Sequence, residues 1–267
     1  MPAMTRSILT HGSDLRLAAT IRPLVVAGDG TVRTALGELA KWKIPAVQLD
    51  ATLAGIRPRD LSQRARKDLA ALIARQGLQL AGVDLFLPRQ HYTDPQHVDR
   101  AVTATLAAIE LAADLGKATL SLGLPVAEVS EEVRRTLVEA ADGRGVRLAV
   151  HAEDQLDALK AWLEAVDQHA LGAGLDPAAC LARSLKPVRT AAMLGKRLAV
   201  ARLSDVTGGA LRCAVGEGEL ELAAYRVAVD LAPSRAGPVV LDLRGVEDPI
   251  KAARAAAAAW DNAAFAG

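Results

Sequence analysis

Short apolar runs rich in Val, Leu and Ala alternate with longer amphipathic stretches along the whole chain. Continuous apolar runs of this length are typical of strands that are buried on both faces, as in a parallel sheet. The pattern predicts eight strands, over Arg16–Ile21, Ala46–Asp50, Leu80–Leu85, Ala118–Leu122, Val146–His151, Gly172–Asp176, Leu198–Leu203 and Pro238–Leu243.

Between the predicted strands, apolar residues recur at spacings of three and four, which predicts helices. Clear examples are Thr31–Trp42, Asp60–Gln76, Asp99–Leu115 and Ser130–Asp142. Gly77, Gly116 and Gly145 each follow a predicted helix closely, where a left-handed C-terminal cap favours a residue without Cβ. Ser130 is followed by two glutamates, as is typical of a helix N-terminus.

The order of these elements predicts the fold. The strands recur roughly every 30 residues, which is the size of a βα unit, and eight such units fill 267 residues as a single (β/α)₈ TIM barrel. A doubly wound open sheet would normally show a Gly-rich phosphate turn after an early strand, and the short Gly28–Gly30 segment lacks its third glycine. No linker or composition step divides the chain, so we expect one domain over residues 1–267.

Composition narrows the class of protein. With 51% hydrophobic residues the chain is too apolar to be disordered, and a net charge of +1 argues against a nucleic-acid partner. No apolar run is long enough for a membrane span, and the first 16 residues lack a secretory signal. Cys180 and Cys213 are too few for a disulfide framework and are expected to be reduced. We therefore expect a cytoplasmic protein without nucleic-acid or membrane partners, and a homo-oligomer stays open.

Ionisable residues gather where the predicted strands end, which is where βα barrels build their sites. Strands end in Asp50, Asp84, His151, Asp176, Arg202 and Asp242, and Glu153, Asp205 and Arg244 lie just beyond. His91 and Tyr92 follow the third strand and overhang the expected barrel mouth. Any one of these residues is explained equally well as a cap or loop residue, but together they indicate a site. We expect the strand ends that carry Asp50, His151, Asp176, Arg202 and Asp242 to open into one pocket.

Several motifs give the chain a family resemblance. LAVHAED, GLDPA, VARLSD, VGEGELEL and GPVVLDLRG follow one another from residue 148 to residue 245, and GLQLAGVDLF and AIELAADLG precede them. In order and spacing they resemble the xylose isomerase-like barrels of the sugar (phosphate) isomerase/epimerase family, over roughly residues 15–260. The glycine-glutamate-glycine turn around Glu217 is the most specific piece. The family also resembles the endonuclease IV fold, but this chain lacks the His and Glu set and the basic groove of a DNA enzyme.

The resemblance implies a divalent metal held by Glu, Asp, His and Glu at strands five to eight, with the two glutamates as acid and base. The matching residues here are His151, Asp176, Arg202 and Asp242, so only Asp176 keeps its type. A further family histidine falls on Ala179. His151, Asp176 and Asp242 form an adequate three-ligand metal set in isolation. Arg202, however, has no lone pair to donate and repels a cation, so we expect weak or no metal binding.

Arg202 is instead expected to hydrogen-bond Asp176 or Asp242 and to supply the positive charge that the metal supplies in relatives. Three functions stay open, since a fold does not fix a function. The first, toward which the sequence leans, is an isomerase or epimerase that moves a proton beside a carbonyl. His151 is then the base, Asp242 the acid or its orienter, and Arg202 the electrophile. Substrate contacts are expected from Asp50, His91, Tyr92, Glu153, Asp205, Glu217 and Arg244. The second is a barrel that binds a small sugar-like or anionic ligand without catalysis, and the third is a structural or assembly member of the family.

Overall fold

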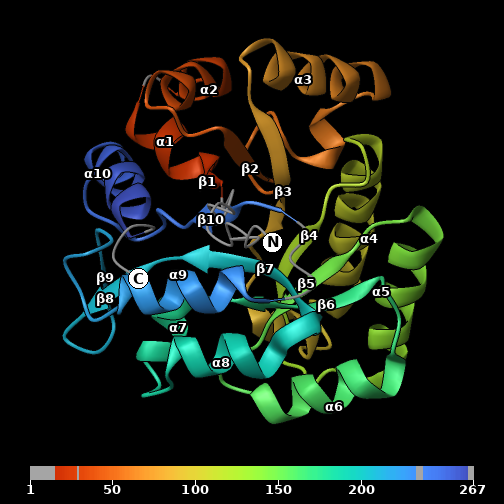
Figure 1. The fold of residues 1–267 in the computed structure, drawn as a ribbon. Helices are drawn as coiled ribbons and strands as arrows, with labels where there is room; N and C mark the ends of the chain where they lie inside the picture. Colours follow the sequence, from red (N-terminus) through yellow and green to blue (C-terminus); the bar gives the residue numbers. More distant parts are fainter. Residues whose placement is uncertain (1–15, 29, 233–236, 264–267) are drawn as a thin grey trace, which may run out of the picture.

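The computed structural model describes residues 16–28, 30–232 and 237–263. The absence of a secretory signal was predicted from the first 16 residues. Of these, residues 1–15 lie outside the described part. Within that part, eight parallel strands close into a barrel in the order β1-β10-β7-β6-β5-β4-β3-β2, and helices surround it (Figure 1). The predicted (β/α)₈ barrel is confirmed.

Each predicted strand corresponds to one barrel strand. The strands are β1 (Leu17–Thr20), β2 (Ala46–Asp50), β3 (Gln79–Leu85), β4 (Leu120–Gly123), β5 (Leu148–His151), β6 (Leu171–Leu175), β7 (Leu198–Leu203) and β10 (Val239–Leu241). The bounds of β2 and β7 agree fully with the prediction. The first strand stops at Thr20 because helix α1 (Ile21–Ala27) begins directly after it.

The larger helices form the outer layer in Figure 1. They are α2 (Val32–Lys41), α3 (Gln63–Arg75), α4 (Val98–Asp114), α5 (Glu131–Arg144), α6 (Leu156–Val166), α8 (Pro187–Leu194), α9 (Leu222–Asp230) and α10 (Pro249–Asn262). Helix α5 begins where the Ser130 hydroxyl accepts the Val133 N–H and ends at Gly145, which has a φ of 65°. Helix α3 starts later than predicted because Ser62 caps it, after the 3₁₀ turn η1 (Pro58–Asp60).

Two elements between β7 and α9 were not predicted. Strands β8 (Asp205–Thr207) and β9 (Leu211–Cys213) pair antiparallel as a small separate hairpin. It lies beside the short helix α7 (Pro177–Leu181), next to the barrel (Figure 1). Its strands are too short and too polar to stand out as an apolar run. The remaining short elements are the 3₁₀ turns η2 (Arg89–Tyr92) and η3 (Gly195–Arg197).

The apolar core has two parts. The larger cluster of buried residues includes side chains from both the strands and the surrounding helices. A second cluster consists of small residues contributed by the barrel strands, namely Ala18, Ala46, Ala149, Ala199, Val200 and Val240. In the described residues no helix has the length and hydropathy that crossing a bilayer requires.

Candidate functional site

Arg202, at the carboxyl end of β7, is the centre of a buried ionic network. Its Nη1 donates to Asp242 Oδ2 at 2.7 Å, and its Nη2 donates to Asp84 Oδ1 at 2.6 Å. The whole residue is 4% exposed. A guanidinium buried to this degree costs several kcal/mol unless carboxylates face it. The expected contact with Asp242 is confirmed, and Asp84 from β3 is a second partner that the sequence did not predict.

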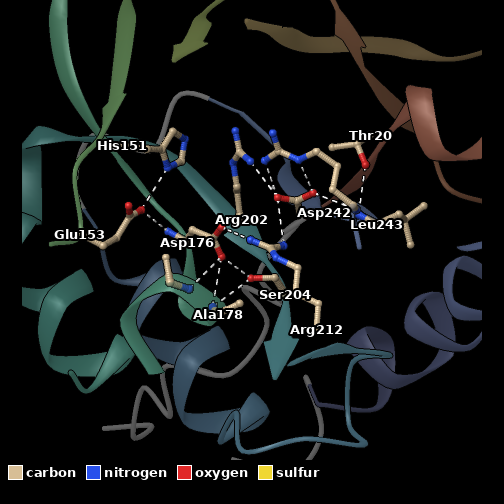
Figure 2. A network of polar contacts seen from close by, with 12 residues as sticks. Thr20, His151, Glu153, Asp176, Ala178, Arg202, Ser204, Arg212, Asp242 and Leu243 are labelled. Carbon is tan, nitrogen blue, oxygen red and sulfur yellow. Dashed lines mark hydrogen bonds and ion pairs between the residues drawn. The ribbon is translucent and has the colours of Figure 1, made fainter. Parts of the chain in front are cut away.

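Two further arginines complete the network, and Figure 2 labels one of them, Arg212, near Arg202 and Asp242. Arg244 donates from Nε and Nη2 to the two oxygens of Asp242, at 2.8 and 2.6 Å, and from Nη1 to Asp84 Oδ2 at 3.0 Å. Arg212, on β9, donates from Nη2 to Asp176 Oδ2, and its Nη1 lies 3.2 Å from Asp242 Oδ2. We call Arg202, Arg212, Arg244, Asp84, Asp176 and Asp242 the Arg–Asp cluster. Its three positive and three negative formal charges cancel.

Asp176 connects this cluster to the local fold. It follows β6 and caps α7, where its Oδ1 accepts the Ala178 N–H at 3.1 Å and the Ser204 hydroxyl at 2.5 Å. Burial opposes ionisation of Asp176, but the guanidinium groups of Arg212 and Arg202 outweigh it and lower the pKa of this carboxyl. The strand end, the helix start and the charge network therefore depend on one ionised side chain.

Asp242 is the most buried carboxylate of the cluster, with 2% of the residue exposed. Burial raises the pKa of Asp242 to about 6, against the lowering effect of Arg202 and Arg212, so the carboxyl is still ionised at neutral pH. For Arg202, burial favours the neutral form, yet Asp84 and Asp242 raise its pKa further above the usual range. Asp242 and Arg202 therefore face one another as an ion pair at neutral pH.

A histidine–glutamate pair lies beside the cluster. His151 Nδ1 is 3.1 Å from Glu153 Oε1, which also accepts the Asp176 backbone N–H at 2.8 Å. When Nδ1 carries the proton toward Glu153, Nε2 carries the lone pair. This Nε2 is buried and has no hydrogen-bond partner among the described residues. Gly174 makes room for the ring, because a Cβ at that position would lie 2.2 Å from Nε2.

These residues meet at a cavity of about 410 Å³ at the barrel mouth. His151 and five guanidinium groups line it, from Arg89, Arg183, Arg202, Arg212 and Arg244. The acidic residues on its wall are Asp84, Glu153, Asp154 and Asp176. Arg89 bridges two sides of the cavity, donating to Asp154 Oδ1 at 2.6 Å and to the Leu124 carbonyl at 2.7 Å. The volume is within the range of pockets for small ligands, about 300–1,000 Å³.

The expectation of one shared pocket needs a correction at Asp50. This carboxylate pairs with Arg22 of α1 at 2.7 Å and accepts the backbone N–H and the hydroxyl of Thr52, both at 2.6 Å. It borders a separate small space instead of the cavity. His151, Asp176 and Arg202 do line the shared cavity, whereas Asp242 does not line it and is buried in contact with three guanidinium groups.

The loop residues after β3 also lie elsewhere. Tyr92 is 2% exposed, and its hydroxyl shares a 2.7 Å hydrogen bond with Thr105 of α4. Burial raises the pKa of Tyr92 to about 12, as expected of a packing residue. His91 stacks on His97, with 4.6 Å between ring centroids, and borders a neighbouring cavity of about 800 Å³. Neither side chain lines the cavity that holds His151.

Asp205 is the first residue of β8, and Glu217 lies in the turn after β9. The Asp205 carboxylate is 1% exposed and accepts four backbone N–H groups, including those of Val206 and Leu220 at 2.9 Å. Gly218 is required here, because a Cβ would lie 2.4 Å from the Asp205 carboxylate. Asp205 therefore shapes the turn, and Glu217 is exposed on it, so neither borders the cavity.

Sequence reasoning assigned no site role to Asp84, Arg89, Arg183 or Arg212. Asp84 did appear as a strand end, which was a usable signal. Arg212 gave no signal, because the hairpin that carries it has no apolar pattern and no family motif. Its contact with Asp176 joins residues 36 positions apart.

The side chains do not fit a divalent metal. Among the described residues, no group of three or more His, Cys, Asp and Glu could hold a metal ion. The oxygens of Asp176 and Asp242 that would be ligands are held by Arg202, Arg212 and Arg244. Guanidinium groups donate hydrogen bonds and have no lone pair for a cation. The positive charge at this position thus belongs to the protein itself.

Comparisons with known proteins agree with the fold. A family model described as a xylose isomerase-like TIM barrel matches residues 36–263. A xylose isomerase domain protein from Planctomyces limnophilus has a TM-score of 0.73 at 16% identity, covering 93% of this chain and 95% of its own. D-psicose 3-epimerase from Clostridium cellulolyticum H10, solved with D-tagatose, has a TM-score of 0.71 at 13% identity, covering 93% and 99%.

A third structure is a xylose isomerase-like TIM barrel protein from Mycobacterium smegmatis in complex with magnesium. Its TM-score is 0.70 at 15% identity, and 96% of this chain and 99% of that chain are covered. No curated protein matches this chain. At these identities the solved structures establish the fold, and the chemistry has to be argued from the residues of this chain.

Proposed function

Because the chain belongs to the xylose isomerase-like TIM barrel family, we propose that it is a sugar or sugar-phosphate isomerase/epimerase-like enzyme in which guanidinium groups take the place of the metal. The reaction is a proton transfer at a carbon next to a carbonyl. The observation that carries this proposal is the His151–Glu153 pair on the wall of a cavity whose other walls carry Arg202, Arg212 and Arg244.

His151 is the proposed general base. Glu153 accepts from Nδ1, which fixes the tautomer that leaves the lone pair on Nε2. Removing a proton beside a carbonyl leaves a negative oxygen, and the fixed guanidinium groups stabilise that charge as it develops. His151 then returns a proton to the former carbonyl carbon, while the proton of the adjacent hydroxyl passes to the former carbonyl oxygen. One C–H bond and one O–H bond are broken and one of each is formed, so the step balances. The proton held on His151 exchanges with solvent before some of the returns, which puts solvent hydrogen into the substrate.

Asp242 is better suited to orienting than to proton transfer. Three arginines contact its carboxylate, which is buried and does not line the cavity. His151 is then the base that serves both half-steps, which favours isomerisation by proton transfer on one face over epimerisation with two opposed acids. Asp242 instead fixes Arg202 and Arg244 in place.

Binding without catalysis is the second candidate. Its support is that arginines hold Asp84, Asp176 and Asp242, which leaves His151 as the proposed acid–base group. A cytoplasmic location remains part of the proposal, supported by the free thiols of Cys180 and Cys213.

The test is exchange of substrate hydrogen with solvent. Small hydroxy aldehydes, ketoses and their phosphates are incubated in D₂O with the protein, and deuterium at the carbon beside the carbonyl is followed by NMR. We expect exchange with at least one compound, and its rate to fall by roughly 10²–10⁴-fold in His151→Asn. Arg144→Gln, which breaks the exposed pair with Glu110, is the matched control and should exchange normally. Undiminished exchange in His151→Asn contradicts the proposal, and no exchange with any compound favours the binding protein.

A further inference from the structure

We infer that the ligand of this cavity carries an oxyanion, a carboxylate or a phosphate, and that Arg183 and Arg212 select it. This inference names the ligand class for the site of the proposed function, but it concerns binding and stands apart from catalysis. Four features of the cavity support it: its unpartnered nitrogens, its engaged carboxylates, the positive charge at its rim and its scarce aromatic surface.

The buried polar atoms without hydrogen-bond partners on the lining residues are all nitrogens. They are Arg89 Nε, His151 Nε2, Arg202 Nε and Arg212 Nη1. An unpartnered Nε also occurs in Arg66 and Arg134, away from the cavity, so these nitrogens only support the features that follow. Arg212 Nη1 lies 3.2 Å from Asp242 Oδ2 in an ion pair, and His151 Nε2 carries the lone pair when Nδ1 holds the proton. Guanidinium N–H groups need acceptors, and buried donors are rarely left without one. A ligand rich in acceptor oxygens suits this wall.

Two of the four acids that line the cavity, Asp84 and Asp176, are already engaged through both oxygens. Asp84 accepts from Arg202 and Arg244 on its two oxygens, and Asp176 accepts from Ser204 and Arg212. A neutral polyol brings many hydroxyl donors, which need free acceptors of just this kind. The part of the cavity around Asp84 and Asp176 therefore favours a ligand that accepts hydrogen bonds over one that donates them.

Arg183 supplies positive charge at the rim. It lies just after α7, lines the cavity, and has an exposed side chain. Its Nη1 donates a 3.1 Å hydrogen bond to the Ala179 carbonyl. Among the described residues, no Asp or Glu forms an ion pair with the Arg183 side chain. The other lining arginines are each paired with a carboxylate. Arg183 is thus the guanidinium whose charge is available to an incoming anion.

Aromatic surface is scarce in the cavity. Phe86 supplies the aromatic ring among the lining residues apart from His151, and the Arg244 guanidinium lies 4.7 Å from its centroid. That cation–π contact occupies one of the two ring faces on which a sugar could stack. Guanidinium groups are more abundant on the lining, and they bind carboxylate and phosphate in a bidentate manner.

The test compares ligands with one carbon skeleton. D-Glucitol, D-gluconate and D-glucitol 6-phosphate are titrated into the full-length protein by calorimetry at low salt. We expect one or both anions to bind at least about tenfold more tightly than the neutral polyol, and the gap to narrow at high salt. The two anions separate carboxylate from phosphate recognition. Glucitol binding as tightly as both anions, or no binding of either anion, overturns the inference.

Variants assign the binding to the named residues. Arg183→Gln and Arg212→Gln should each weaken the bound anion by about tenfold, whereas Arg144→Gln removes the same charge elsewhere and should not. Arg183 is exposed and lies outside the cluster, so its variant is expected to fold. Unchanged affinity in Arg183→Gln and Arg212→Gln contradicts the inference. If an anion binds but no hydrogen exchange is found, the ligand inference holds and the proposed function is wrong. If an uncharged sugar exchanges hydrogen and neither anion binds, the proposed function holds and the ligand inference is wrong.

Discussion

Two arginine–aspartate arrangements lie at the mouth of this barrel, and they differ in kind. At the end of β2, Asp50 pairs with Arg22, whose side chain is 40% exposed. At the ends of β3, β6, β7 and β10, the Arg–Asp cluster surrounds Arg202, whose side chain is 4% exposed. Both places pair arginine with an aspartate at or near the end of a barrel strand, although Arg22 comes from α1 and Arg212 from β9. Burial and the number of partners, and not residue type, decide which arrangement borders a usable cavity.

The cluster also joins distant parts of the chain. Arg202 and Asp84 are 118 positions apart, and Arg244 and Asp84 are 160 apart, so the network ties late strands of the barrel to an early one. The Arg22–Asp50 pair connects neighbouring elements at the edge of the mouth. The difference predicts that the two regions respond unequally when one charge is removed.

The largest effect is expected from Arg202→Met. Removing this guanidinium leaves Asp84 and Asp242 buried beside one another with fewer partners. Breaking a buried ion pair from one side costs about 3–5 kcal/mol, and we expect a loss of that size in the free energy of unfolding. Urea denaturation of the variant and the parent measures it.

Arg22→Met is the matched comparison for Arg202→Met. Its partly exposed guanidinium is solvated, and Thr52 still donates two hydrogen bonds to Asp50. An exposed pair contributes up to about 1 kcal/mol, so the loss should be no larger. If both variants lose the same stability, the distinction between the two regions is wrong.

A smaller effect on the free energy of unfolding is expected when the pH is lowered and Asp176 is protonated. The folded-state pKa of Asp176 is lowered by Arg212 and Arg202, although burial opposes this. A lowered pKa stabilises the fold above the unfolded value, near 3.9, and this contribution is lost as the pH falls through the folded-state value. The stability difference between the parent and Asp176→Asn should therefore be largest near neutral pH and shrink below about pH 4. A constant difference over pH 3–7, in denaturation series, argues against an ionised Asp176 in the cluster.

Much of the fold was predictable because the barrel strands are continuous apolar runs with clear punctuation. Helix α5, for example, begins after Ser130 and ends at Gly145, as the sequence predicts. The β8–β9 hairpin was not predictable, since its three-residue strands carry no apolar period. Local pattern therefore gives the scaffold but not the insertion that supplies Arg212.

The site was predictable in part. Strand ends identified His151, Asp176, Arg202 and Asp242, because parallel strands place their carboxyl ends together. The sequence pattern could not show that Asp50 and Tyr92 lie outside the cavity. Asp50 pairs with Arg22 of α1, and the Tyr92 ring is buried with its hydroxyl bonded to Thr105 of α4. Which side chains meet depends on contacts between residues far apart in the chain, and the local pattern of one sequence does not reveal those contacts.

The central claim is that protein guanidinium groups occupy the position of a catalytic metal. Calorimetric titration of the dialysed protein with Mn²⁺, Co²⁺ and Zn²⁺ tests it, with Arg202→His/Arg212→Ala as the comparison. That double variant frees carboxylate oxygens of Asp176 and Asp242 and adds an imidazole beside His151. We predict no stoichiometric metal binding by the parent protein and measurable Zn²⁺ or Co²⁺ binding by the double variant. One tightly held equivalent in the parent, lost on His151→Asn or Asp176→Asn, would contradict the account.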